Sequence, residues 1–213
     1  MPNEAVTDKK SVLYETGRVL AGILFHTLMP VRYHHGEKLR KLEGPAVLIS
    51  NHVHALDPVI LALQVPGQCI FLGKKELAIN GPVRRMLTNL HCILVDRHHT
   101  DMEAMRACMK ALKMKKILVL FPEGTRHHEG QMEQIENGTS LIVLRGKAPL
   151  IPVYLDRPLK CFRRVHAWVG DPIEYGDLLE QGVNVDTCEQ LNERMRTVFR
   201  RMKAEADQAS EKS

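Results

Sequence analysis

From residue 45 onward, apolar runs of four to six residues alternate with segments whose apolar positions recur at helical spacing. Short apolar runs bounded by turn signals are typical of buried strands, and the 3.6-residue spacing is typical of helices packed on a sheet. The pattern predicts an α/β fold with a mostly parallel or mixed sheet flanked by helices. The expected strands are 45–50, 68–72, 92–95, 117–121, 150–155 and 165–169, and the expected helices are 57–63, 83–89, 100–112, 134–144 and one beginning near 186.

Two of these helices have capping signals at their starts. Thr100 with Glu103 three residues later matches a capping box, and Asp186 with Glu189 repeats the pattern before the last helix. Apolar residues then continue the last helix on one stripe. We therefore expect helix starts at these two positions.

The first 40 residues carry a separate helical pattern. Apolar residues recur at helical spacing from 12 to 28, with Ser11 as a candidate N-cap after two lysines. The most apolar stretch, 19–29, is about 11 residues long, whereas a membrane span needs about 20. Two interpretations stay open: the helix packs on the domain, or it lies in the surface of an anionic membrane.

Composition and charge narrow the possible partners. The chain has 213 residues, a net charge of +5 and a pI near 9.0, which favours anionic partners such as membrane lipid, nucleic acid or acidic substrates. Aromatic residues make up only 5% and are not interleaved with basic runs, which argues against nucleic acid. Five widely spaced cysteines indicate reduced thiols in a cytoplasmic protein. The paired histidines lack recurring ligand spacing, so no metal site is expected.

The first candidate chemistry follows the strand at 45–50. His52 and Asp57 lie four intervening residues apart, across a turn into a helix. An imidazole can take a proton from an alcohol, and a carboxylate on its other ring nitrogen would orient it and stabilise the imidazolium. His54 lies three residues before Asp57 and competes for the role of base, and these polar groups could also simply cap a helix. Spacing alone leaves the choice open.

The second candidate follows the strand at 117–121. Glu123 can bond a hydroxyl or a backbone amide, and Gly124 allows close approach of the backbone to a ligand. Thr125 and Arg126 can bind a phosphate through a hydroxyl and a guanidinium fork. In sheets of this kind ligands gather at the carboxyl ends of the strands, where both motifs are expected. A base facing an anion-recognition loop indicates transfer chemistry on a phosphorylated alcohol.

Together the motifs resemble the glycerolipid acyltransferase family that includes 1-acylglycerol-3-phosphate acyltransferase. Asn51, His52 and Asp57 match its Asn-His-x4-Asp block, and the match assigns the base to His52. Residues 121–126 match the Phe-Pro-Glu-Gly-Thr-Arg block without substitution. Three further segments of the chain resemble blocks of the family: 93–97, which ends in Asp96-Arg97, the segment from Lys74 to Leu77, and 149–153.

Three positions depart from the family pattern. His91 and Arg84 stand where glycines are usual, and Glu136 stands where the family often has a lysine. The departures fall in the presumed region for the acceptor and the acyl chain. They bear on the choice of acceptor more than on the reaction.

The resemblance implies an acyltransferase that moves a fatty acyl group from acyl-CoA or acyl carrier protein to a lysophospholipid hydroxyl. The acceptor it implies is 1-acylglycerol 3-phosphate, in phospholipid biosynthesis, with no metal or cofactor. His52 would act as base and Asp57 would orient it, while Arg97 and Arg126 hold the acceptor phosphate and residues 123–125 shape the pocket. Residues 1–40 would form a helical membrane-association segment and 41–213 the α/β acyltransferase domain. The protein would be peripheral on the inner, cytoplasmic face of the membrane.

Two alternatives on the same fold are a non-catalytic phospholipid- or phosphate-binding protein and an acyl-thioester hydrolase. The first is favoured if the departing residues close the pocket, and the second needs only water in place of the acceptor. The sequence leaves open the acyl-chain length, the thioester carrier, the acceptor head group and the oligomeric state.

Overall fold

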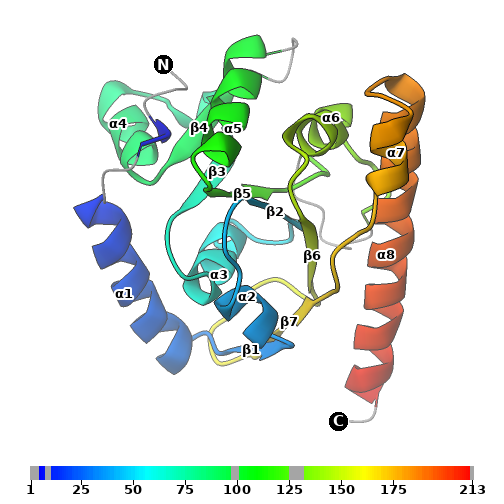
Figure 1. Cartoon of the computed structure of the whole chain (residues 1–213). Coiled ribbons are helices and arrows are strands. Elements are labelled where there is room, and N and C mark those ends of the chain that lie inside the picture. Colours follow the sequence, from blue (N-terminus) through cyan, green and yellow to red (C-terminus); the bar gives the residue numbers. More distant parts are fainter. Residues whose placement is uncertain (1–4, 8–10, 97–100, 125–131, 212–213) are drawn as a thin grey trace.

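The computed structural model describes residues 5–7, 11–96, 101–124 and 132–211 (Figure 1). In these ranges one mixed sheet holds seven strands in the order β1-β7-β6-β2-β5-β3-β4. Five neighbouring pairs are parallel, and only β6 and β7 are antiparallel. The strands are β1 (Val31–His34), β2 (Ala46–Ser50), β3 (Cys69–Lys74), β4 (Cys92–Val95), β5 (Ile117–Leu120), β6 (Leu150–Leu155) and β7 (Val165–Val169).

Helices cover both faces of the sheet, so alternate residues of the central strands enter two separate apolar clusters. One cluster joins the sheet to α5 (Met102–Lys113), α6 (Asn137–Gly146) and α8 (Val185–Glu211). The other joins it to α1 (Val12–Thr27), α2 (Glu37–Arg40) and α3 (Asp57–Gln64). The remaining elements are η2 (Lys75–Leu77), α4 (Gly81–Asn89) beside β4, and α7 (Gly176–Glu180).

This arrangement confirms the predicted fold class, and each predicted strand is present within two residues of its expected bounds. Strand β2 illustrates the reason, because all five of its residues are buried, as expected for a parallel strand covered on both faces. The sequence pattern missed β1, α2 and α7. Strand β1 is short and contains polar residues, so its sequence lacks the apolar run of the other strands. Parallel pairing with β7 holds it in place.

Several predicted helix starts were wrong by one to three residues: α4 begins at Gly81 and not at 83, and α6 begins at Asn137 and not at 134. Both predicted capping boxes were also misplaced. The N-cap of α5 is Asp101, whose side chain accepts a hydrogen bond from the Ala104 N–H at 2.9 Å. The predicted cap, Thr100, lies outside the described residues. The cap of α8 is Asn184, which exchanges backbone-to-side-chain hydrogen bonds with Thr187. In both cases the carboxamide or carboxylate nearest the first free N–H groups takes the capping role.

The predicted N-terminal helix is present as α1, capped by Ser11. One side packs against α3 and buries Tyr14 and Phe25, while the outer side exposes a stripe of apolar residues. Val19, Leu20 and Ile23 are 64%, 62% and 59% exposed. Among the described residues no helix combines the length and the apolar character that a bilayer span requires. The division into residues 1–40 and 41–213 stays a prediction.

Candidate active site

The carboxylate of Asp57 organises the loop that follows β2. Asp57 is the first residue of α3 and is completely buried. Its Oδ2 accepts three hydrogen bonds, from the His52 ring Nδ1 at 2.8 Å and from the N–H groups of Val53 and His54 at 2.7 Å each. The N-terminal end of a helix also favours a negative charge. The carboxylate therefore fixes both the loop and the orientation of one imidazole.

The two candidate histidines are separated by this geometry. The His52 ring donates from Nδ1 to Asp57, which leaves Nε2 as the basic nitrogen, and the ring lines a large cavity. The His54 Nδ1 instead accepts a hydrogen bond from the Leu56 N–H at 3.2 Å, so that ring belongs to the local turn. Only the backbone of His54 reaches Asp57. His52 is the histidine placed to act as a base.

Further contacts hold His52 in position. The buried Asn51 side chain bonds both the N–H and the C=O of Leu155 at 2.8 Å, which ties the end of β2 to the end of β6. The rings of His52 and Phe121 are stacked, with centroids 4.2 Å apart. A base held by packing and by hydrogen bonds at both ends loses little entropy when a substrate binds.

The second motif meets the first through Glu123. This nearly buried carboxylate accepts from the His52 backbone N–H at 3.0 Å and from the Met132 N–H at 3.1 Å. Glu123 thus joins the loop after β5 to the loop after β2. Of its two predicted partners, a hydroxyl or a backbone amide, it bonds backbone amides. Gly124 has a φ of 68° and lines the cavity, so its turn needs the conformational freedom of glycine. The predicted residues Arg97, Thr125 and Arg126 lie outside the described residues.

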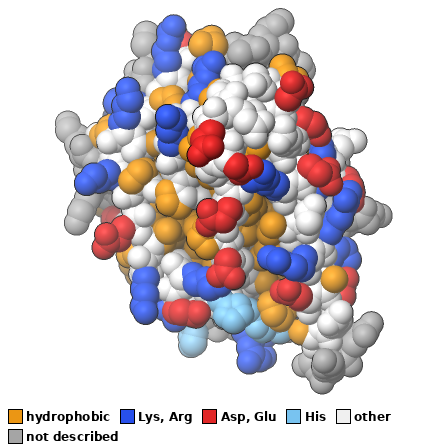
Figure 2. Space-filling view, turned by 45° about the vertical axis from the view of Figure 1, so that its right-hand side comes forward, with side chains coloured by type: hydrophobic (Ala, Val, Ile, Leu, Met, Phe, Trp, Pro, Cys, Tyr) orange, Lys and Arg blue, Asp and Glu red, His pale blue; other side chains and the backbone are white. Residues whose placement is uncertain are grey.

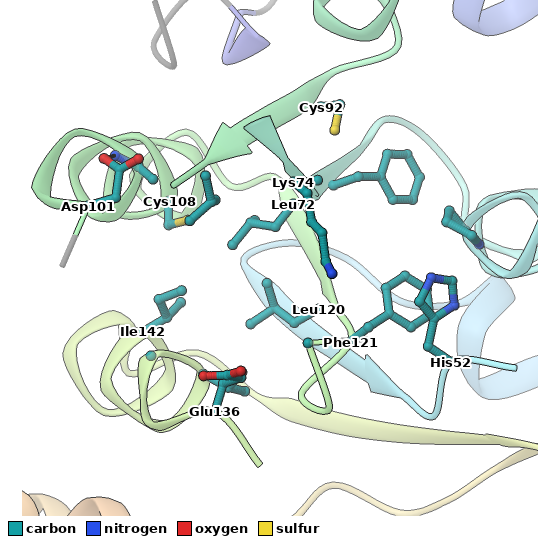
Figure 3. Close-up of a pocket in the computed structure, with 18 of the residues that line it drawn as sticks. His52, Leu72, Lys74, Cys92, Asp101, Cys108, Leu120, Phe121, Glu136 and Ile142 are labelled. Carbon is teal, nitrogen blue, oxygen red and sulfur yellow. Dashed lines mark hydrogen bonds between the residues drawn. The ribbon is translucent and has the colours of Figure 1, made fainter. Parts of the chain in front are cut away.

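The cavity has a volume of about 1310 Å³ and spreads from His52 over the carboxyl ends of β3, β4 and β5. Its walls are mostly apolar, with Leu72, Leu120 and Ile142 among the residues on the side of α5 and α6 (Figure 3). Helix α1 forms part of the opposite side through Gly17 and Ala21. An apolar space of this size beside a base is suited to a hydrocarbon chain.

Lys74 belongs to one of the family-like segments, but the sequence reasoning did not place it among the site residues. It ends β3, and Figure 3 shows its side chain reaching into the cavity toward the space beside Phe121 and His52. In the described part of the chain no carboxylate lies within ion-pair distance of its amine. The signal that could have identified it is its position as the last residue of a strand whose neighbours carry the motifs.

The three departing positions take different places. His91 has a φ of 59°, and its buried ring bonds the Ala5 carbonyl through Nδ1 at 3.1 Å, so it anchors the N-terminal segment. Arg84 is exposed on α4, and Glu136 lines the cavity at the start of α6. Of the three, Glu136 is the one that can act on a ligand directly.

Burial determines the chemistry of the thiols near the cavity. It raises the pKa of Cys92 and of Cys108 to about 12, so both are protonated and poor nucleophiles. Within the described ranges no cluster of three or more His, Cys, Asp or Glu side chains is arranged to hold a metal ion. The hydrogen-bonded pair of His52 and Asp57 is the candidate for acid–base chemistry at this site.

Fold and site together define an α/β protein with a histidine–carboxylate pair at the carboxyl ends of its parallel strands. A family model described as Acyltransferase matches residues 30–156. The chain belongs to this acyltransferase family, which confirms the family resemblance of its motifs.

Several characterised proteins are similar to this chain. The 1-acyl-sn-glycerol-3-phosphate acyltransferase of Streptococcus pneumoniae is 27% identical over 83% of this chain and 67% of its own length. The human 1-acyl-sn-glycerol-3-phosphate acyltransferase alpha is 29% identical over 52% of this chain and 40% of its own length. The chain therefore spans less than half of the human relative.

The fold is also similar to that of solved structures. The crystal structure of PlsC, the 1-acyl-sn-glycerophosphate (LPA) acyltransferase of Thermotoga maritima, aligns with a TM-score of 0.68. The alignment covers 96% of this chain and 85% of that chain at 19% sequence identity. The likeness extends the shared fold over nearly all of the present chain, including α1.

Proposed function

We propose that this protein transfers a fatty acyl group from an acyl thioester to the free hydroxyl of 1-acylglycerol 3-phosphate. The observation that carries the proposal is the 2.8 Å hydrogen bond from His52 Nδ1 to Asp57 Oδ2 at the edge of a large apolar cavity. The names of the relatives support the same acceptor. The donor is acyl-CoA or acyl carrier protein, and the pathway is phospholipid biosynthesis.

The reaction needs one base and no covalent intermediate on the protein. His52 Nε2 takes the proton of the acceptor hydroxyl as its oxygen attacks the thioester carbonyl. Asp57 stabilises the imidazolium that forms, as the carboxylate does in a serine-hydrolase triad. The tetrahedral intermediate then collapses, the C–S bond breaks, and the imidazolium returns its proton to the leaving thiolate. The products are a diacyl phospholipid and a free thiol, so atoms and charges balance.

Cations around the mouth would bind the acceptor phosphate. Lys74 is the described candidate, because its amine extends into the cavity toward His52 (Figure 3). Arg97 and Arg126 are the candidates that the family motifs add. A phosphate held there would direct the glycerol hydroxyl toward His52, while the acyl chain occupies the apolar part of the cavity.

Membrane attachment through α1 is part of the proposal. A lysophospholipid resides in a bilayer, and the exposed apolar stripe of Val19, Leu20 and Ile23 provides a surface that a bilayer can cover. Helix α1 also contributes to the cavity wall, so the attached face and the site are neighbours. The protein would work as a peripheral protein on the cytoplasmic face of the membrane.

The direct test is the release of free thiol from acyl-CoA with and without lysophosphatidic acid. Acceptor-dependent release supports acyl transfer, whereas acceptor-independent release identifies a thioester hydrolase. Binding of lysophosphatidic acid without any release identifies a non-catalytic lipid-binding protein.

A matched pair of variants tests the assignment of the base. His52→Ala removes the proposed base and should abolish release, whereas His54→Ala removes only a local turn contact and should retain most of it. Equal loss of activity in both variants, with both folded by circular dichroism, would contradict the role of His52.

A further inference from the structure

The connection between β6 and β7 ends in a tight turn whose sequence is unusual for its shape. Lys160 and Arg163 form a β-bridge, and the Arg163 N–H donates to the Lys160 carbonyl at 3.3 Å. Phe162, at the third position of the turn, has a φ of 59°. This left-handed conformation favours glycine or asparagine, and a bulky side chain there carries backbone strain.

The side chain of Phe162 lies mostly outside the packed interior. It is 82% exposed, the largest fraction among the exposed large apolar residues of the described chain. A strained backbone that presents an aromatic ring to the outside has no explanation in folding stability. An outlier of this kind indicates a function outside the folded core.

The turn is fixed next to the exposed face of α1. The Phe162 N–H donates to the carbonyl of Leu28, the C-cap residue of α1, at 2.7 Å. Leu28 is itself 40% exposed at the C-terminal end of the helix. The turn that carries the aromatic ring is therefore fixed to the C-terminal end of the helix that carries the stripe.

Three basic residues neighbour Phe162 in the turn. Lys160, Arg163 and Arg164 are all exposed, and in the described ranges none of them has an acidic partner within ion-pair distance. The α8 side of the molecule differs, because there acidic and basic side chains are interspersed (Figure 2) and pair closely, as in Arg196–Glu189 at 2.9 Å. An exposed apolar residue flanked in the turn by unpaired cations is complementary to an anionic bilayer, whose headgroups bind cations and whose interface accepts aromatic rings.

We propose that the 160–164 turn is a second membrane contact, which inserts Phe162 into an anionic lipid bilayer beside α1. The inference rests on the proposed attachment of α1 to a membrane and extends it to a second point. A contact at the C-terminal end of α1, added to the stripe along the helix, would fix the orientation of the protein on the bilayer, which one amphipathic helix does not do.

Phe162→Gly is the informative variant, because glycine removes the ring and also suits the positive φ. The full chain should melt at the same temperature as wild type or higher. Its partition onto vesicles of phosphatidylcholine and phosphatidylglycerol in equal parts, measured by sedimentation, should fall by about tenfold, since one phenylalanine leaves the apolar interface. Arg163→Gln with Arg164→Gln should weaken binding to these vesicles while leaving binding to pure phosphatidylcholine vesicles unchanged.

Val185→Ala is the matched control. Val185 is 80% exposed, but it begins α8, which lies across the molecule from α1 (Figure 1). Unchanged vesicle binding in Phe162→Gly, or an equal loss in Val185→Ala, would overturn the proposal. Self-association of wild type without lipid that disappears in Phe162→Gly would also overturn it, because the partner would then be a second copy. Binding is measured without substrates, so a failure of acyl transfer would refute the proposed reaction and leave this result standing.

Discussion

Replacing Asp57 by asparagine removes one negative charge from the site and leaves its shape nearly unchanged. An amide oxygen in the place of Oδ2 can still accept from His52 Nδ1 and from the backbone N–H groups of Val53 and His54. The new NH2 group would occupy the place of Oδ1, which has no hydrogen-bond partner in the described structure. An unsatisfied buried donor costs about 1 to 3 kcal/mol of stability, so the variant should fold but melt at a lower temperature.

The effect on catalysis follows from the distance between the charges. With 2.8 Å between Nδ1 and Oδ2, the centres of the carboxylate and the protonated ring lie about 4 Å apart. At an effective dielectric constant of about 20, their attraction is about 4 kcal/mol. The amide loses most of this attraction at the point where His52 carries the proton. The barrier should rise by about 3 to 4 kcal/mol, which lowers kcat about a hundred- to a thousandfold.

The assay is steady-state release of thiol from acyl-CoA at saturating lysophosphatidic acid, below the melting temperature of the variant. We expect a lower kcat with little change in the KM for the acceptor, because Asp57 is buried and does not reach the cavity. A loss of kcat smaller than about tenfold would refute the reasoning, since the charge would then not be stabilising the imidazolium.

Three further predictions concern other parts of the site and fold. Lys74→Met should raise the KM for lysophosphatidic acid by about 10- to 100-fold with a smaller change in kcat, and an unchanged KM would exclude a phosphate role. Iodoacetamide should label Cys161 rapidly in the native protein, whereas Cys108, whose pKa burial raises to about 12, should label only after unfolding; mass spectrometry reads both. Burial holds the pKa of His91 below its ordinary value near 6.5, so the unfolded state binds protons more readily and the contribution of His91 to stability is lost as pH falls below about 6.5. His91→Asn keeps the turn and cannot titrate, so its melting temperature should fall less than that of wild type between about pH 8 and pH 5.

The order of strands and helices was readable from the sequence because the central strands are buried on both faces. A strand such as β2, with five consecutive buried residues, needs an uninterrupted apolar run, and such runs stand out between polar turns. The same reasoning failed for β1, because none of its four residues is fully buried and its pairing with β7 spans more than 130 residues of sequence. Non-local pairing leaves no local signal.

The sequence predicted candidate residues for the site, but it did not predict how the loops bring them together. The spacing placed His52 and His54 equally well for a contact with Asp57, and the choice came only from the family resemblance. What separates them is the path of the loop, in which two backbone N–H groups and one ring converge on a single carboxylate oxygen. The place of Lys74 in the cavity likewise depends on how β3 lies against β5, which a local pattern does not contain.

The most direct test of the central role of His52 is mass spectrometry of the lipids formed from palmitoyl-CoA and 1-oleoylglycerol 3-phosphate by wild type and by His52→Ala. The mechanism predicts a phosphatidate that carries both chains, formed in equal amount to free CoA, with wild type only. Free palmitate as the main product, or the same yield of phosphatidate from His52→Ala, would contradict it.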